Sequence, residues 1–142
     1  MKKAVLFFSA FILSLSLFAQ EQNATEVVKF NEMSYDFGKI KQNVPVNHDF
    51  TFTNISVNPI VIESAIASCG CTTPVKPEGA VPKGKESKIN AGFNAANPGP
   101  FNKTITVKVA GVTMPVQLRI TGEVLTPDAY AKYEAEKGKA KS

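Results

Sequence analysis

The chain has 142 residues, of which 44% are hydrophobic, and a formal net charge of +4 at pH 7. Without Lys2 and Lys3, which belong to the predicted leader described next, the 16 basic residues fall to 14 against 12 acidic ones, so the net charge falls to +2. The remaining basic residues are dispersed, whereas nucleic-acid binding needs a basic face with interleaved aromatic side chains. This composition predicts one globular domain with its own core and argues against a nucleic-acid partner.

The N-terminal segment has the pattern of a secretory leader. Lys2 and Lys3 are followed by an apolar run over residues 4–18, and Ala19 offers a small residue for cleavage. The run is shorter than the roughly 20 apolar residues that a transmembrane helix needs. We therefore expect residues 1–20 to be a signal peptide. The mature chain is then exported to the periplasm, cell envelope or extracellular space, with no transmembrane anchor after cleavage.

The next segments alternate polar and apolar residues with a period of two, which is typical of half-buried strands. The alternation is clearest over Val112–Val124 and Phe101–Val109, and Ala110-Gly111 between them predicts a tight hairpin turn. Pro115 cannot donate a hydrogen bond to a neighbouring strand, so an edge or a bulge is expected there. Further strands are predicted at Val27–Phe30, Tyr35–Phe37, Val46–Thr53, Ile60–Ile62 and Ile89–Phe93.

About seven short strands without an intervening helix are typical of an immunoglobulin-like fold. The sequence therefore predicts an all-β, immunoglobulin-like antiparallel β-sandwich over residues 21–125. Residues 126–142 form a separate tail, in which Thr126 can cap a short helix that begins at Pro127 and ends before Gly138. The tail is either a frayed C-terminal helix or a docking element.

The two cysteines, Cys69 and Cys71, are separated by one residue in the run Ser68-Cys69-Gly70-Cys71-Thr72. Along an ideal strand their Cα atoms would be ~7 Å apart, at the upper limit of disulfide geometry. A disulfide therefore requires a bend, and Gly70 is its expected hinge because positive φ costs glycine little. Closing so short a loop would contribute only ~1.5 kcal/mol before strain is subtracted.

Three interpretations of the cysteine pair remain open. As a disulfide or as thiols, Cys69 and Cys71 can simply shape a tight loop. A strained disulfide would also be readily reduced and could exchange with other thiols. As free thiolates the pair could bind Cu(I), although zinc would need more ligands than His48 and the methionines outside the leader readily supply. No resident cofactor is expected.

His48 is the sole histidine, so a Ser-His-Asp or Cys-His catalytic arrangement would have to use it. It shares a strand face with Phe50 and Phe52, where a packed, hydrogen-bonded histidine is the ordinary expectation. No nucleophile-elbow sequence is present either. We therefore expect the protein not to be an enzyme.

Several segments together carry a family resemblance. They are Asp36-Phe37-Gly38-Lys39-Ile40, Phe50-Thr51-Phe52-Thr53-Asn54, Pro59-Ile60-Val61-Ile62, Ser68-Cys69-Gly70-Cys71-Thr72 with Pro74, Pro82-Lys83-Gly84, and residues 99–107. On these residues the chain resembles the bacterial domain-of-unknown-function family numbered 1573, small exported immunoglobulin-like sandwiches. It departs from that pattern at Asn54-Ile55-Ser56, where a turn of Asn-Thr-Gly type is usual. The resemblance implies the fold and brings no activity with it.

These observations predict a non-enzymatic exported protein that presents strand edges or loops to another envelope or extracellular protein. The alternative function is thiol-based redox chemistry or Cu(I) handling through Cys69 and Cys71.

Overall fold

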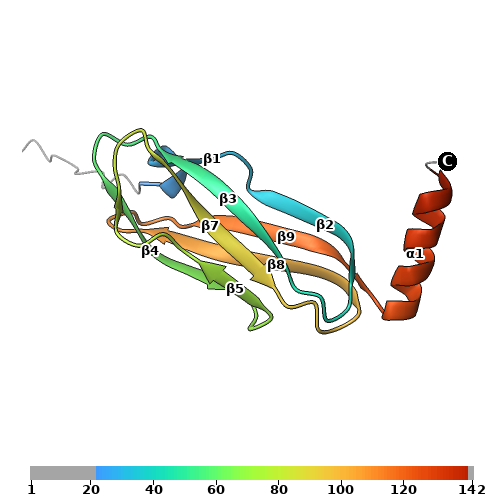
Figure 1. Ribbon diagram of the computed structural model, residues 1–142. Coiled ribbons are helices and arrows are strands. Elements are labelled where there is room, and N and C mark those ends of the chain that lie inside the picture. The colour runs from blue at the N-terminus through green and yellow to red at the C-terminus, as the bar shows by residue number, and fades with distance from the viewer. Residues whose placement is uncertain (1–21, 141–142) are drawn as a thin grey trace, which may run out of the picture.

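The computed structural model describes residues 22–140. Within them, two sheets pack face to face as a sandwich, and one helix projects from one end (Figure 1). The strands are β1 (Val28–Phe30), β2 (Ser34–Lys41), β3 (Val46–Asn54), β4 (Ile60–Ala67), β5 (Thr72–Val75), β6 (Ala80–Val81), β7 (Glu86–Phe93), β8 (Gly99–Val109) and β9 (Val116–Leu125). A short 3-10 helix, η1 (Ala24–Glu26), precedes them, and α1 (Pro127–Ala140) follows.

The strands form one sheet in the order β1-β3-β7-β5 and a second in the order β2-β9-β8-β4-β6. The predicted all-β, immunoglobulin-like sandwich is confirmed. The described chain has nine strands instead of about seven, because β5 and β6 are too short to show an alternation.

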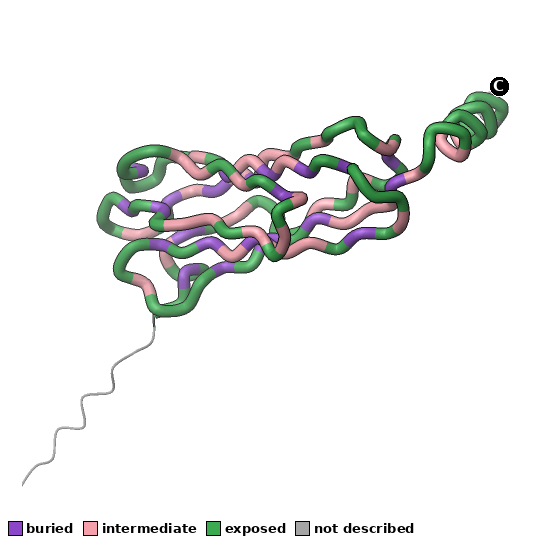
Figure 2. Tube along the Cα trace, turned by 90° about the horizontal axis from the view of Figure 1, so that it is seen from below, coloured by how far each residue is buried: buried purple, intermediate pink, exposed green. Residues whose placement is uncertain are grey.

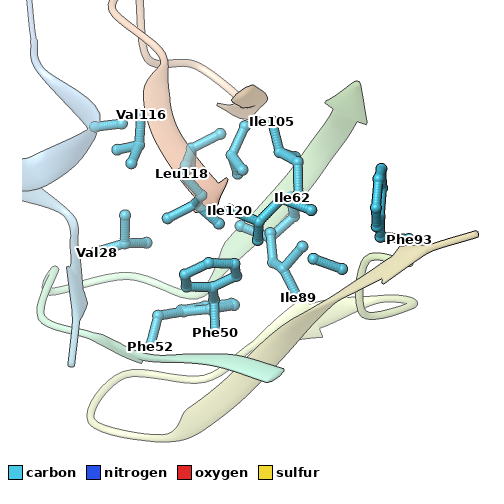
Figure 3. Close-up of a cluster of buried hydrophobic side chains, with 14 of the residues drawn as sticks. Val28, Phe50, Phe52, Ile62, Ile89, Phe93, Ile105, Val116, Leu118 and Ile120 are labelled. Carbon is cyan, nitrogen blue, oxygen red and sulfur yellow. The ribbon is translucent and has the colours of Figure 1, made fainter. Parts of the chain in front are cut away.

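The core lies between the two sheets, where the apolar residues of the alternating segments meet (Figure 2). Phe50 and Phe52 of β3 point toward Ile62 of β4 and toward Leu118 and Ile120 of β9, and all five side chains are fully buried (Figure 3). Burial of each such side chain is worth roughly 1.5–3 kcal/mol. The period-two pattern therefore locates the inward faces correctly.

The β8–β9 hairpin has the predicted turn. The Val112 N–H donates to the Val109 carbonyl at 3.1 Å, and Gly111 has a φ of 78°. Pro115 lies outside the ladder, because β9 begins only at Val116. The strand is thus shorter than the alternation suggested, since Pro115 has no N–H to donate.

Strand β2 differs from its prediction in length and direction. It extends from Ser34 to Lys41 and pairs in parallel with β9, whereas an entirely antiparallel sandwich was predicted. The register shifts between Asp36 and Lys39, where Gly38 has a φ of 65°. This bulge moves the alternation by one residue, and Ile40 is buried as a result. The shift hid the second half of the strand from the sequence pattern.

Helix α1 starts as predicted, with the Ala129 N–H donating to the Thr126 hydroxyl at 3.4 Å. It continues through Gly138 to Ala140, further than predicted. It contacts β2 and β9, and Lys39 Nζ lies 5.1 Å from the centroid of the Tyr133 ring. The rest of the helix is largely exposed (Figure 2). None of the helices described between residues 22 and 140 has the length and apolar character to cross a membrane. The predicted signal peptide lies outside the described residues.

Candidate functional site

The Cys-Gly-Cys motif lies where the chain changes sheets. Strand β4 of one sheet ends at Ala67, and β5 of the other sheet begins at Thr72. The two strands are in contact, and Figure 1 shows them side by side. A strand can pass from one sheet to the other only through a bend. Residues 68–71, here named the corner, supply that bend.

In the structure Cys69 and Cys71 are joined by a disulfide, with their Cα atoms 5.3 Å apart. The Thr72 N–H donates to the Cys69 carbonyl at 3.3 Å, which closes a four-residue turn with Gly70 and Cys71 at its centre. The φ of Gly70 does not lie in the left-handed region, and a Cβ added there would meet no atom within 4 Å. The bend thus lies at Gly70, as expected, and this turn forms without the positive φ that glycine would permit.

Thr72 is a site residue that sequence reasoning missed. It is only 3% exposed, and its Oγ1 lies 3.8 Å from Cys69 Sγ and 4.0 Å from Cys71 Sγ. A buried hydroxyl needs a hydrogen-bond partner, and here the partners are the two sulfur atoms. The only signal in the sequence was that a hydroxyl residue directly follows the second cysteine.

A cavity of about 120 Å³ lies beside Cys71. Its walls include Phe93, Asn94, Phe101 and Lys103. The rings of Phe93 and Phe101 stack with their centroids 4.1 Å apart. The cavity therefore combines an aromatic wall with polar groups and one positive charge beside Cys71.

His48 does not join the corner. It lies on β3, which β7 separates from β5. Its Nε2 is 2.7 Å from Glu32 Oε1, and its ring stacks on Tyr35 with the centroids 3.6 Å apart. The ring also meets Phe50 edge to face. Its surroundings are those of a packed, hydrogen-bonded side chain.

The other soft donors are placed elsewhere. Met33 lies between β1 and β2, and Met114 lies between β8 and β9, where it pairs with Asn23. Over residues 22–140, no three or more histidine, cysteine, aspartate or glutamate residues are grouped so that they could hold a metal ion. The structure thus brings Cys69 and Cys71 together with Thr72, and leaves the remaining predicted donors apart.

A second feature lies next to the corner, on β4. The first two residues of β4, Ile60 and Val61, pair with β6. Residues 62–67 of β4 pair only with β8 among the described strands. The Ser68 N–H donates to the Thr104 carbonyl at 2.9 Å. In an antiparallel pair every second residue bonds to the neighbouring strand, so this bond shows which residues of β4 bond to β8. Ser64 and Ile66 therefore direct their backbone groups toward β8, and Ala65 and Ala67 direct theirs to the opposite side, where no described strand pairs with them. We call residues 62–67 the open edge.

Asp49 lies on the polar outer face of the other sheet, where both of its carboxylate oxygens accept hydrogen bonds. Asp49 Oδ2 accepts from Lys88 Nζ at 2.6 Å, and Asp49 Oδ1 accepts from Asn90 Nδ2 at 2.6 Å. The hydrogen bond from Lys88, followed by that from Asn90, lowers the pKa of Asp49 below its ordinary value of 3.8.

Solved structures define the class of the fold. The chain is similar to the ASH/PapD-like domain of human CEP192, with 8% identity and a TM-score of 0.59 over 85% of this chain and 99% of that one. A protein of unknown function from Porphyromonas gingivalis W83 gives 10% identity and a TM-score of 0.58 over 78% of this chain and 51% of that one. The VesB protease of Vibrio cholerae gives 14% identity and a TM-score of 0.55 over 71% of this chain.

The chain therefore spans about half of the Porphyromonas protein and 33% of VesB. At these identities the similarity shows an immunoglobulin-like, PapD-like sandwich and nothing more. Residues 28–124 match the family of proteins of unknown function DUF1573, and the chain belongs to that family. No functionally curated protein matches the sequence.

Proposed function

We propose that this protein is an exported, non-enzymatic interaction module that binds an extended segment of another envelope or extracellular protein along its open edge. The observation that carries the proposal is that the backbone groups of Ala65 and Ala67 point away from β8 and have no ladder partner among the described strands. An extended segment can add to such an edge as a further strand, with main-chain hydrogen bonds providing affinity.

The other sheet edges are less suited to strand addition. Strand β1 has three residues and β6 has two, so each offers few hydrogen bonds. Strand β5 contains Pro74, and β2 has a bulge at Gly38 with Lys39 and Lys41 nearby. Lysine, proline and bulges are the usual means by which proteins protect an edge. The open edge contains a bulge near Ile62 but neither lysine nor proline.

The open edge carries one strongly exposed apolar side chain, Ile66, and a second, Val75, lies on the outer face of the other sheet. Ile66 of β4 is 64% exposed, and Val75 of the neighbouring β5 is 61% exposed. In strand addition, contacts with alternate side chains give the specificity that backbone hydrogen bonds lack. Ile66 is therefore the proposed specificity contact for an apolar side chain on the incoming segment, whereas Val75 faces the same side as its ladder partner Asn90.

Two further observations support export and the absence of catalysis in the proposed function. The leader pattern of residues 1–20 supports export. The packing of His48 against Tyr35 and Glu32 supports a structural role for the sole histidine. The proposed binding therefore depends on the surface that the sandwich presents.

The test uses a photo-crosslinking amino acid placed at Ile66 in the full chain, expressed in its native cells. The matched control position is Asn47, an exposed residue on the other sheet. We expect a discrete crosslinked partner from position 66 and none from position 47. Adding Ala65→Pro should abolish the crosslink, because it removes an outward N–H but no hydrogen bond to β8.

Ala65→Ser keeps the N–H and should retain the crosslink. Thermal unfolding of both Ala65 variants verifies that the sandwich is intact. A crosslink at position 66 that persists in Ala65→Pro, or one equally strong at position 47, would refute strand addition at this edge.

A further inference from the structure

We propose that the Cys69–Cys71 disulfide is a thiol–disulfide exchange site that oxidises an exposed dithiol of another protein. The proposal is independent of strand addition at the open edge. It rests on three observations at the corner: a cavity lined by Cys71 and not by Cys69, a buried hydroxyl within reach of both sulfur atoms, and hydrogen bonds that hold the turn.

The cavity gives an incoming thiolate a place next to Cys71. Both cysteines are half-buried, and Gly70 between them is exposed. Lys103 in the cavity wall adds a positive charge, which favours a thiolate over a neutral thiol. Phe93 and Phe101 form the buried apolar wall of the cavity. The attacked atom is therefore Cys71 Sγ, and Cys69 Sγ is the leaving group.

Thr72 is placed to stabilise that leaving group. Its hydroxyl is buried and lies 3.8 Å from Cys69 Sγ. When the disulfide opens, negative charge develops on Cys69 Sγ, and a hydrogen bond to a charged acceptor is stronger than one to a neutral acceptor. The lower the pKa of the leaving thiol, the faster it leaves. Thr72 is a positioning residue for the sulfur atoms, and its hydroxyl favours the opened form.

The corner does not depend on the disulfide to keep its shape. Its backbone is also held by hydrogen bonds from the Ser68 N–H to the Thr104 carbonyl at 2.9 Å and from the Asn94 N–H to the Cys71 carbonyl at 3.0 Å. The Thr104 N–H donates in turn to the Ser68 hydroxyl at 3.2 Å. The disulfide can therefore open and close in the folded protein.

The reaction balances in two steps. A partner thiolate attacks Cys71 Sγ, a mixed disulfide forms, the Cys69–Cys71 bond breaks, and its electron pair stays on Cys69 Sγ. The second partner thiolate then attacks the partner sulfur of the mixed disulfide and releases Cys71 as a thiolate. The partner dithiol has lost two electrons and two protons, and Cys69 and Cys71 have gained them as thiols.

The first test measures exchange in the folded, oxidised chain. The probe is a synthetic peptide carrying a reduced Cys-Gly-Gly-Cys sequence, and thiols are trapped with a maleimide and counted by mass spectrometry. We expect the peptide to become oxidised as Cys69 and Cys71 become reduced, without loss of the β-sheet circular dichroism signal. A disulfide that opens only when the protein unfolds would overturn the proposal.

Two variants of Thr72 distinguish a role of its hydroxyl in disulfide exchange from a purely structural role. Thr72→Val removes the hydroxyl and should slow opening of the disulfide about tenfold, because the leaving thiolate loses its hydrogen bond. It should also shift the pH profile for alkylation of reduced Cys69 to higher pH. Thr72→Ser keeps a hydroxyl and should retain most of the rate. Equal rates and pH profiles in the three proteins would exclude the role of Thr72.

The two cysteine variants test which sulfur is attacked. In Cys69→Ser the resolving thiol is absent, so a mixed disulfide between Cys71 and an oxidised cysteine peptide should accumulate. In Cys71→Ser the remaining thiol lies away from the cavity, and the mixed disulfide should form more slowly. Faster trapping at Cys69 would contradict the assignment. If the reduced chain binds Cu(I) tightly but exchanges with neither peptide, the pair is a metal site and the proposal fails.

Discussion

The imidazole of His48 lies flat on the phenol ring of Tyr35, with the centroids 3.6 Å apart and the ring planes inclined by 6°. His48 belongs to β3 of one sheet and Tyr35 to β2, the edge strand of the other. Glu32, in the segment that connects β1 to β2, binds His48 Nε2 at 2.7 Å. This group of three side chains therefore links the two layers at the β2 edge.

We expect the stack to stabilise the fold measurably. In a double-mutant cycle of Tyr35→Ala and His48→Ala, the coupling energy should be about 0.5–1.5 kcal/mol, the usual value for an aromatic pair. The measurement is urea unfolding at neutral pH. Tyr35→Phe keeps the ring and serves as the control with little loss of stability. A coupling energy near zero would show that the two rings are merely adjacent.

Gly122 is a position where any side chain meets fixed atoms. A Cβ there would lie 2.8 Å from the Gly38 carbonyl oxygen and 2.7 Å from Phe101 Cζ. Gly122→Ala should therefore destabilise the protein by about 1–3 kcal/mol, because β2 or the Phe101 ring must shift. Gly70→Ala is the matched control, since a Cβ there meets nothing within 4 Å. Denaturant unfolding of both variants should show a loss for Gly122→Ala alone.

Asn54 is fully buried and satisfies each of its side-chain hydrogen bonds. Its Nδ2 donates to the carbonyls of Asn58 and Val81, both at 2.9 Å, and its Oδ1 accepts from the N–H and hydroxyl of Ser56. Asn54→Ala leaves these groups without partners and should cost about 2–4 kcal/mol. Asn102→Ala, at an exposed position of β8, should change the thermal midpoint little. Similar midpoints for both variants would disprove the role of Asn54.

The Asp49–Lys88 pair predicts a defined dependence on pH. Because the pKa of Asp49 is lowered in the folded protein, its stabilisation is present above the ordinary value of 3.8 and is lost as the pH falls through the lower folded pKa. Lys88→Met should raise the pKa of Asp49 toward that ordinary value, incompletely because Asn90 still donates. Carboxyl-carbon NMR titration measures the shift directly.

The Lys88→Met variant should be less stable than the parent protein at neutral pH. This difference in stability should shrink as the pH falls below 3.8. Lys108→Met, which removes an exposed ammonium 3.8 Å from Glu63, controls for the loss of one charge. A stability difference between Lys88→Met and the parent protein that stays constant down to strongly acidic pH would contradict the Asp49–Lys88 ion pair.

The sequence was sufficient to predict the class of the fold and its inward faces, because the alternation along β3, β7, β8 and β9 reports burial directly. It was insufficient for β2, since a bulge at Gly38 breaks the period and no local pattern specifies parallel pairing with β9. The start of β9 was misplaced for a similar reason: the alternation extends through Pro115, but the hydrogen-bonded ladder does not.

The candidate site was predictable only in part. The spacing of Cys69 and Cys71 correctly drew attention to the corner, but the conformation of Gly70 depends on the turn type, which the sequence did not specify. The position of Thr72 is a property of the tertiary structure, because β5 must pair with β7 before the hydroxyl becomes buried. The open edge likewise depends on how short β6 is, and a two-residue strand has no sequence signature.

Strand β9 separates the N-terminal segment from helix α1. The N-terminal segment pairs with Met114 just before the ten-residue β9 begins, and α1 starts directly after β9 ends. At about 3.3 Å per residue, the two attachment points lie roughly 30 Å apart, at opposite poles of the sandwich. The Asn23–Met114 pair and the start of α1 are therefore held a full strand length apart, at the two ends of β9.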